Sequence, residues 1–557
     1  MRIRAAALAL SLFLALDRHA LAAWPPGGTE VGVTPIQLAP VMIEDGQGGA
    51  FLAWQTGDLY DDIRFTHYTS RGEPANGWPA GGIALGTYFW QPRPRLISDG
   101  RSGTLVAWNE SGMPPFIGWF RLRHYLGNGR PAPGWPDSPV GLSFPGDTRD
   151  SDPLFLSDGR GGVIVVVPSR KNLVIYEPPI AVQRIDERGG FPWGGEWRYL
   201  SPESRAPLTT CAAEDGSGGV FVAWSEGIPA SAQLYLQRID ESGVVARGWP
   251  TRGIPIGAGD VTRLQPAMLP DGHGGALIAW PASGAMRAIR ILGDGTIAPG
   301  WSAEGAVIFR TTGSGLRLCS DGDAGVIAAW QDSRPRSHGS DVRAQRIDAN
   351  GVVRWLADGV PICVMAGSQV QVSLSPDRRG GAFLAWSDGR LGELRFAIYA
   401  SHVLGSGEIA RGYPAGGTPV GDGVQQFGSV IVFDPGGAPL VAWQDRPDFE
   451  SNPRVLLTQL EAPRPGPVVE TPRRLSRVKF GLSATPYVRF EADRAGLARV
   501  EVFDVGGRRV GASQAMWVEP GERSANPDVP RNLRPGVYLV RIFLGERVTT
   551  TRVALLK

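Results

Sequence analysis

The chain has 557 residues, among them 76 glycines, 47 prolines and 18 tryptophans. Its 56 Lys and Arg residues against 54 Asp and Glu residues leave a net charge of +2, which gives no electrostatic support to a nucleic-acid or membrane-surface role. Glycine at about twice its usual share, together with many tryptophans and β-branched residues, excludes disorder and indicates short, well-packed strands joined by turns.

The N-terminus has the pattern of a targeting segment. Met1–Arg4 is basic, Ala5–Leu16 is apolar, and Ala20–Ala22 is a small-x-small cleavage motif. We therefore expect residues 1–23 to be a secretory signal peptide, since the apolar run is too short to cross a bilayer as a helix. No later stretch predicts a transmembrane helix, so the mature protein is expected to be exported.

Residues 24–461 contain one pattern many times: an Asp-Gly-x-Gly-Gly-like turn, four mostly apolar residues and then Ala-Trp. The leading aspartates are Asp45, Asp99, Asp158, Asp215, Asp271, Asp321, Asp377 and Asp434. Nine positions after each come Trp54, Trp108, Val167, Trp224, Trp280, Trp330, Trp386 and Trp443. The spacing of 50 to 59 residues between copies marks a tandem repeat.

Each copy predicts four strands. In the seventh, Gln369–Leu374 alternates as a half-exposed strand does, and the run ending at Trp386 is apolar enough to be covered on both faces. The Asp-Gly between the two runs predicts a hairpin turn. A third run, seen as Gln183–Asp186, is followed by a second turn and a fourth strand with one aromatic beside it. These aromatics are Trp78, Trp135, Trp193, Trp249, Trp301, Trp355 and Tyr413.

Eight such copies predict an all-β fold, an eight-bladed β-propeller with four antiparallel strands in each blade. Seven blades is the alternative, if the third copy, which has Val167 in place of tryptophan, is irregular. The last copy has no fourth strand after Val455–Leu460. Because Trp24–Gly28 resembles Trp78–Gly82, we expect residues 24 to about 34 to supply that outer strand and close the ring.

The repeat ends at a proline-rich linker, residues 462–476. Short strand-like runs beyond it predict a small immunoglobulin-like β-sandwich at 477–557. Within it, Val500–Val510, Gly536–Arg541 and Arg552–Lys557 resemble the C-terminal sorting domain of type IX secretion cargo and the immunoglobulin-like domain of flagellar hook-capping proteins. The family's usual Trp-Asp-Gly is replaced here by Ser524–Asp528. The resemblance implies export by the type IX machinery to the outside or outer surface of a Gram-negative bacterium.

No catalytic, cofactor-binding or metal-binding residue is predicted, and no cofactor. The histidines lie in separate copies or in the signal peptide, without the paired spacing of a zinc site; they are His19, His67, His124, His273, His338 and His402. No Gly-x-Ser-x-Gly motif is present. Cys211 and Cys319 fall in predicted strands, where they are expected to be small core residues.

The repeated aspartate has three interpretations. As a turn former it accepts local backbone hydrogen bonds, and this interpretation is favoured. The Asp-box of sialidases has its aromatic about five residues after the Asp, whereas the gap here is nine, and calcium loops need an alternating Asp-x-Asp-x-Asp-Gly run that no copy has. The repeated tryptophan is likewise expected to pack in the core rather than to stack on sugars.

Function is expected on the face formed by the connections between second and third strands, because these vary between copies while the turns of the other face are short and nearly invariant. The charged residues expected near a ligand there are Asp61, Asp62, Arg170, Lys171, Arg334 and Arg390. The leading hypothesis is a secreted or cell-surface binding or adhesion module for an extracellular protein or glycan. The alternatives are a carbohydrate-active enzyme (a glycosidase or lyase) and a structural exoprotein.

Overall fold

The protein is built from β-strands. The computed structural model describes residues 24–460 and 478–555, apart from connections inside these ranges, the longest of which are 86–93, 112–117, 144–152, 169–179 and 201–208. The predicted signal peptide and linker lie outside the described residues. Among the described residues there are 40 strands, a three-residue 3-10 turn at Pro229–Ser231 and no α-helix. None of them forms a helix long and apolar enough to cross a membrane.

Strands β1 to β32 form eight four-stranded antiparallel sheets, numbered here 1 to 8 in chain order. Sheet 1 contains β2 (Gln37–Glu44), β3 (Ala50–Thr56), β4 (Ile63–Tyr68) and β5 (Ile83–Ala84), and sheet 2 contains β6 (Arg95–Ser98), β7 (Thr104–Ser111), β8 (Gly118–Tyr125) and β9 (Val140–Ser143). Sheet 3 contains β10 (Leu154–Ser157), β11 (Val163–Pro168), β12 (Ile180–Ile185) and β13 (Arg198–Leu200), and sheet 4 contains β14 (Thr210–Glu214), β15 (Val220–Glu226), β16 (Ala232–Ile239) and β17 (Ile254–Gly259). Sheet 5 contains β18 (Ala267–Pro270), β19 (Ala276–Ala282), β20 (Ala285–Ile291) and β21 (Ala306–Arg310), and sheet 6 contains β22 (Gly313–Ser320), β23 (Val326–Asp332), β24 (Asp341–Ile347) and β25 (Val360–Cys363). Sheet 7 contains β26 (Gln369–Pro376), β27 (Ala382–Asp388), β28 (Ala397–Val403) and β29 (Thr418–Pro419), and sheet 8 contains β30 (Gln425–Val432), β31 (Leu440–Arg446), β32 (Arg454–Gln459) and β1 (Thr29–Glu30).

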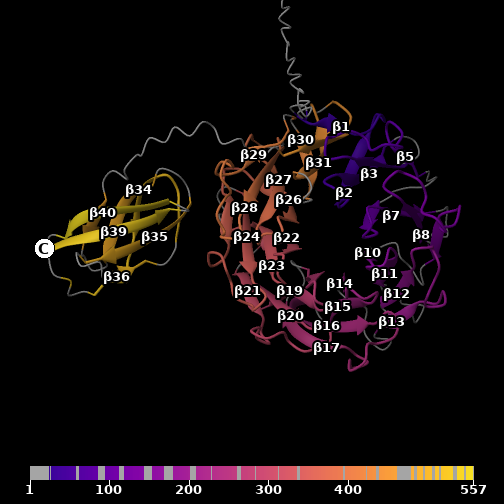
Figure 1. The fold of residues 1–557 in the computed structure, drawn as a ribbon, viewed down its shortest axis with the longest axis horizontal. Helices are drawn as coiled ribbons and strands as arrows, with labels where there is room; N and C mark the ends of the chain where they lie inside the picture. The colour runs from indigo at the N-terminus through magenta and orange to yellow at the C-terminus, as the bar shows by residue number, and fades with distance from the viewer. Residues whose placement is uncertain are drawn as a thin grey trace, which may run out of the picture.

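Within sheets 1 to 7, neighbouring strands follow one another in sequence. Figure 1 shows the eight sheets in chain order around a ring, from the indigo β2 and β3 through magenta to the orange β30 and β31. The predicted all-β architecture of repeated four-stranded antiparallel sheets is confirmed.

Sheet 8 combines the two ends of the repeat region. Its strand order is β1-β32-β31-β30, with Thr29 paired to Leu457. Gly28, just before β1, has φ +87°, and a Cβ there would lie 2.7 Å from the Trp443 ring. Gly82 of sheet 1 has φ +79° and lies against the tryptophan of its own sheet in the same way. The likeness between Trp24–Gly28 and Trp78–Gly82 thus has a physical cause, because only glycine combines this φ with this close approach.

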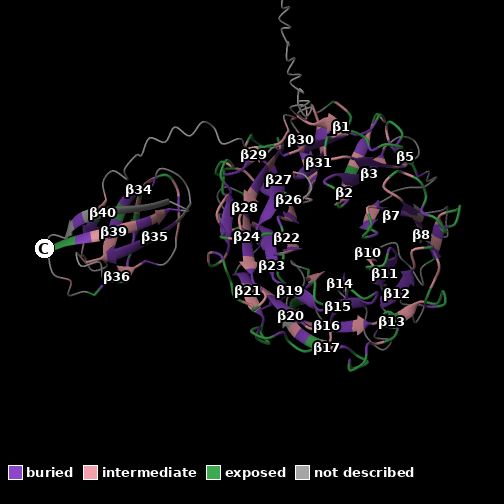
Figure 2. Ribbon diagram, in the orientation of Figure 1, coloured by how far each residue is buried: buried purple, intermediate pink, exposed green. Residues whose placement is uncertain are grey.

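The second strands of the sheets carry the core (Figure 2). Every residue of β27 is buried, as is every residue of β19. The repeated tryptophans Trp54, Trp224, Trp330, Trp386 and Trp443 are among the largest fully buried side chains, and Trp108 and Trp280 are buried too. Their predicted core role is confirmed. Val167 of sheet 3 is also fully buried, in the same position of β11.

The C-terminal residues form two further sheets around a core of their own. The first sheet contains β33 (Lys479–Gly481), β34 (Tyr487–Ala492) and β38 (Gly521–Ala525); the second contains β36 (Arg509–Ala512), β35 (Gly496–Phe503), β39 (Gly536–Leu544) and β40 (Arg547–Leu555), with β37 (Met516–Val518) also paired to β35. Phe490 of the first sheet and Val500 and Val540 of the second belong to one buried cluster. The two sheets therefore pack face to face.

Candidate functional site

The repeated aspartates close the first turn of their sheets. In sheet 4, Oδ1 of Asp215 accepts the backbone N–H groups of Ser217 and Gly219, both at 2.8 Å. The same two bonds, at 2.7 to 2.9 Å, are made by Asp45, Asp99, Asp158, Asp271, Asp321 and Asp377. Their predicted role as turn formers is confirmed. Asp434 lies outside the described residues.

The second oxygen of each aspartate pairs with a basic side chain of the third strand, a contact that the sequence analysis missed. Arg238 lies with Nη2 2.8 Å and Nε 3.0 Å from Oδ2 of Asp215. The equivalent partners in the other sheets, at 2.7 to 3.0 Å, are His67, His124, Arg184, Arg290, Arg346 and His402. The signal was in the recurring Gln-Arg-Ile-Asp run, whose arginine is this partner.

Five of these pairs also join one sheet to the next, through a carbonyl oxygen that lies near the basic side chain. Arg238 donates Nη1 to the carbonyl oxygen of Gly293 in sheet 5 at 2.8 Å, and Trp249 donates Nε1 to the same oxygen at 3.0 Å. We call this set of aspartate, basic residue, carbonyl oxygen and tryptophan a seam latch. It recurs with the carbonyl oxygens of Gly127, Glu241 and Gly405 as acceptors. The tryptophans of the fourth strands therefore have a structural role.

Histidine replaces arginine in three of these pairs. His67 has Nε2 2.7 Å from Asp45 Oδ2 and Nδ1 2.8 Å from the carbonyl oxygen of Gly127. The two ring nitrogens of His67 thus face an oxygen of their own sheet and an oxygen of the next sheet, as the guanidinium nitrogens of Arg238 do.

Acid is expected to weaken the latches. Burial by itself raises the pKa of Asp215, but the hydrogen bonds from Arg238, Ser217 and Gly219 outweigh it and hold the pKa below the usual 3.8. The pKa values of Asp45, Asp99, Asp271 and Asp377 are lowered in the same way. A carboxyl group whose pKa is lower in the folded protein than in the unfolded chain stabilises the folded state fully at any pH above its unfolded pKa. This contribution to stability is lost as the pH falls below about 4.

The measurement is the urea midpoint of unfolding at pH 7, 5, 4 and 3. We expect little change from these groups between pH 7 and 5 and a steep fall below pH 4. A midpoint that rises or stays level between pH 5 and 3 would contradict the assignment.

The charged residues predicted to surround a ligand are only partly brought together. Asp61, Arg170 and Lys171 lie outside the described residues. Arg334 and Arg390 lie at the ends of second strands in the adjacent sheets 6 and 7. Each is held by the aspartate two positions earlier: Nε of Arg334 is 2.9 Å from Asp332 Oδ1, and Nε of Arg390 is 2.9 Å from Asp388 Oδ1.

Both aspartates are buried, and burial opposed by hydrogen bonds from Arg390 and Trp386 leaves the pKa of Asp388 lowered. Arg390 also lies 3.8 Å from the centre of the Tyr399 ring. Asp62 contributes its backbone N–H to Thr56 Oγ1 at 3.2 Å. These two arginines thus anchor the start of the second-to-third connections, and the sequence did not predict their aspartate partners.

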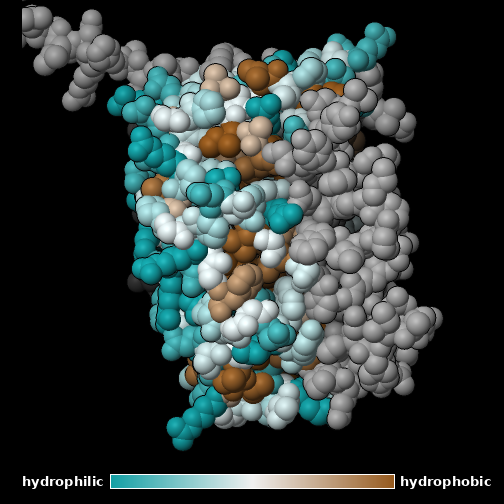
Figure 3. All heavy atoms as spheres, turned by 90° about the vertical axis from the view of Figure 1, so that its right-hand side faces the viewer, coloured by the Kyte–Doolittle hydropathy of each residue, from teal (hydrophilic) through white to brown (hydrophobic). Residues whose placement is uncertain are grey.

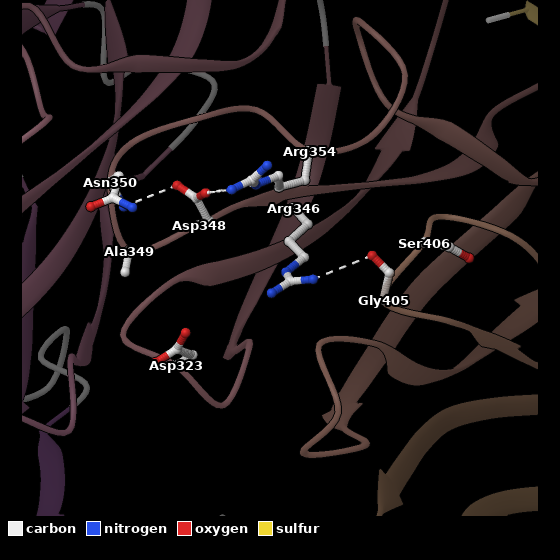
Figure 4. Close-up of a pocket in the computed structure, with 8 residues that line it drawn as sticks. All are labelled: Asp323, Arg346, Asp348, Ala349, Asn350, Arg354, Gly405 and Ser406. Atoms are coloured by element: carbon white, nitrogen blue, oxygen red, sulfur yellow. Dashed lines mark hydrogen bonds and ion pairs between the residues drawn. The ribbon is translucent and has the colours of Figure 1, made fainter.

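A pocket of about 400 Å³ lies between sheets 6 and 7, at the end of the ring where the first and third turns meet. Its walls, shown in Figure 4, are Asp323, Arg346, Asp348, Ala349, Asn350, Arg354, Gly405 and Ser406. All but Arg346 and Arg354 come from turns. The pocket therefore lies at the end opposite to the second-to-third connections, where the sequence placed its candidates.

The three cysteines are buried and free. Burial raises the pKa values of Cys211 and Cys363 to about 12, and that of Cys319 is also raised, so thiolate is scarce at neutral pH. Their predicted role as small core residues is confirmed for Cys211 and Cys319. Across the described residues no group of three or more His, Cys, Asp or Glu side chains is arranged to hold a metal ion.

Comparison with known proteins gives no family. No family model and no curated protein matches the chain. Among solved structures, prolyl oligopeptidase B from Galerina marginata aligns at TM-score 0.39 and 12% identity, over 74% of this chain and 55% of that one. An ulvan lyase aligns at 0.37 and 10%, over 78% and 94%. A protein of unknown function from Dyadobacter fermentans aligns at 0.33 and 12%, over 78% and 100%. Likeness at this level does not bear on function.

Proposed function

We propose that sheets 1 to 8 are the blades of an eight-bladed β-propeller, and that this propeller is a secreted or cell-surface module for binding or adhesion. The antiparallel four-stranded sheets, their ring order in Figure 1 and the pairing of β1 with β32 support the blade count. Closing the last sheet with the N-terminal strand leaves no open end in the ring.

The observation that carries the binding role is the use of the repeated polar residues in the seam latches. Seven aspartates accept N–H groups of their own turns. Five of their basic partners also contact a carbonyl oxygen of the next sheet. The repeat thus builds a rigid frame, in which the repeated polar side chains contact other parts of the same chain. Variable connections on such a frame are the usual place for recognition.

Figure 3 shows one side of the ring, the right-hand side of Figure 1. The described residues on this side are mainly hydrophilic, with separate hydrophobic areas. On this side a ligand held by polar contacts is favoured, which points to a glycan or a polar protein segment.

The C-terminal sandwich is proposed to be an immunoglobulin-like sorting domain, residues 477–557, that exports the propeller through the type IX machinery of a Gram-negative bacterium. The two strands that carry most of the resemblance, β35 and β39, are paired neighbours in one sheet. Residues 1–23 are proposed as the signal peptide for the inner membrane and 462–476 as the linker between the two parts.

The test is a glycan-array screen of the purified mature chain, with turnover assayed on every bound glycan. We expect retention without turnover, and at least a tenfold loss of binding on joint replacement of Arg170 and Lys171 by alanine, since each charged contact to a ligand contributes about 1.5–3 kcal/mol. The matched control replaces Arg130 and Arg188, exposed turn residues of the opposite face, and should bind like the parent.

Turnover of a bound glycan would replace the adhesion role with that of a carbohydrate-active enzyme. Absence of binding to every glycan would remove glycans as the ligand. Equal losses in the two double variants would contradict the choice of face.

A further inference from the structure

The larger C-terminal sheet has one face turned away from the core of the sandwich. Along its paired strands β35 and β39 (Figure 1), alternate residues such as Val500, Val502, Val540 and Ile542 belong to the buried cluster. Successive side chains of a strand point to opposite faces, so the residues between them lie on the other face. We call this the outer face; its residues on the two strands are Arg499, Glu501, Phe503, Leu539, Arg541 and Phe543.

Two arginines of the outer face lie over aromatic rings of the neighbouring strand. The guanidinium carbon of Arg499 is 4.4 Å from the centre of the Phe543 ring, and that of Arg541 is 4.8 Å from the centre of the Phe503 ring. Cation–π attraction holds a guanidinium group against the ring beneath it. Its N–H edge stays free in this position, and that edge has the geometry to bind a carboxylate through two hydrogen bonds.

The outer face carries more positive than negative charge. The carboxylate of Glu501 is shared by two arginines, since Nη1 of Arg509 in β36 lies 3.2 Å and Nη1 of Arg499 lies 3.4 Å from its Oε1. Glu501 is only 6% exposed as a result. Arg541 stands opposite Glu501 in the ladder, yet within the described part of the chain its guanidinium makes no ion pair. Three guanidinium groups thus surround one carboxylate, and that of Arg541 is available to a partner.

Apolar side chains lie beside these cations. Phe503, Leu539 and Phe543 are half-buried, and Val537, which continues the same face at the start of β39, is 48% exposed. Aromatic residues and arginine together, without lysine, are typical of the centre of a protein–protein interface. A partner that presents carboxylates and apolar side chains side by side therefore matches this face in charge and in composition.

We propose that the outer face docks an acidic segment of another protein. A carboxylate of that segment pairs with the free N–H edge of Arg541, and an apolar side chain lies on the adjoining Phe503 ring. In an extended segment, residues two positions apart share one face, so an acidic and an apolar residue at that spacing meet both groups at once.

This surface goes beyond the sorting role proposed for the C-terminal domain. It names a face of that domain and the chemistry of what the face binds, and it depends neither on the route of export nor on the ligand of the propeller. Its test therefore needs no secretion assay.

The test is the fluorescence anisotropy of a labelled, capped Glu-Ser-Leu-Ser-Glu peptide titrated with the full mature chain. A second peptide has glutamine in place of both glutamates. We expect saturable binding of the acidic peptide that weakens as sodium chloride is raised from about 50 to about 500 mM, and no measurable binding of the glutamine peptide. Arg541→Gln should bind the acidic peptide roughly tenfold more weakly, the loss expected for one charge-assisted pair at a partly exposed site.

Arg489→Gln is the matched control. Arg489 lies on β34 of the other sheet, is exposed, and has its guanidinium carbon 5.2 Å from the centre of the Tyr487 ring. The variant therefore makes the same charge change at another stacked arginine and should bind the acidic peptide like the parent. Arg541→Lys keeps the charge without the planar fork and should bind with an affinity between those of the parent and Arg541→Gln. The urea midpoint of unfolding shows that each variant is folded.

Three results would overturn the proposal: equal binding of the two peptides, unchanged binding in Arg541→Gln, or equal losses in Arg541→Gln and Arg489→Gln. Polygalacturonate, which carries carboxylates without apolar side chains, separates a protein partner from an acidic glycan. Polygalacturonate that binds as tightly as the peptide, per carboxylate, would also overturn the proposal, because the face would then recognise negative charge alone.

Discussion

Replacing Asp215 by alanine is expected to lower the free energy of unfolding by about 3–5 kcal/mol. The substitution removes the acceptor of Arg238, whose Nε and Nη2 lie 3.0 and 2.8 Å from Oδ2 of Asp215. It also leaves the N–H groups of Ser217 and Gly219 without the oxygen that accepts them. A buried ion pair that loses one member keeps the desolvation cost of the other, so the effect is much larger than for a surface pair.

Two further variants separate the contributions at Asp215. Asp215→Asn keeps an oxygen for the turn but removes the charge, and an intermediate loss is expected. Asp240→Ala in the third turn of the same sheet removes an aspartate that accepts the N–H of Ser242 at 2.9 Å, and about 1 kcal/mol is expected for that bond. Urea unfolding followed by tryptophan fluorescence measures all three. Equal losses for Asp215→Ala and Asp240→Ala would show that the seam latch adds nothing to the turn.

The repeat made the local structure predictable. Strand periodicity, the Asp-Gly turn and the position of the buried tryptophan are encoded within about ten neighbouring residues, which pattern reading handles well. The match between Trp24–Gly28 and Trp78–Gly82 likewise located β1, because the same close glycine contact is needed in both sheets.

The seam latches could not be predicted in the same way, because each joins residues of two sheets. Arg238 pairs with Asp215 within sheet 4, and the same arginine donates to the carbonyl oxygen of Gly293 in sheet 5. The partner also changes between histidine and arginine, so that no single residue type marks the position. Only the shared property, a side chain whose nitrogen atoms can face two oxygens, is constant.

The pocket between sheets 6 and 7 was missed for a different reason. The sequence analysis looked for function where the copies differ most, whereas this pocket is lined mainly by residues of the short first and third turns, such as Asp323 and Gly405. A space between two sheets depends on how these turns pack against each other, which the pattern within one copy does not encode.

The tryptophan of each second strand supports the second large prediction: Trp386→Ala is expected to cost about 3–5 kcal/mol of unfolding free energy. Trp386 is fully buried in β27, stacks near Tyr399 and donates Nε1 to Asp388 Oδ2 at 2.8 Å. A Cβ on Gly417 would lie 2.4 Å from its ring. Backbone packed this closely around the indole cannot collapse into the space that alanine leaves, so most of the cavity cost is retained.

In sheet 3 the position of the repeated tryptophan is held by Val167. We expect valine to be tolerated at this position in sheet 3 but not in sheet 7. Three partly buried aromatic residues, Phe155, Phe191 and Trp197, pack against the cluster that contains Val167. Tyr399 alone is the partly buried aromatic described against the cluster of Trp386, so Trp386→Val is expected to lose nearly as much as Trp386→Ala. Trp197→Ala, which truncates a partly exposed indole, is the control and should cost about 1–2 kcal/mol. Urea unfolding of the three variants decides: a Trp386→Val variant as stable as the parent would mean that the tryptophan is not what fills sheet 7.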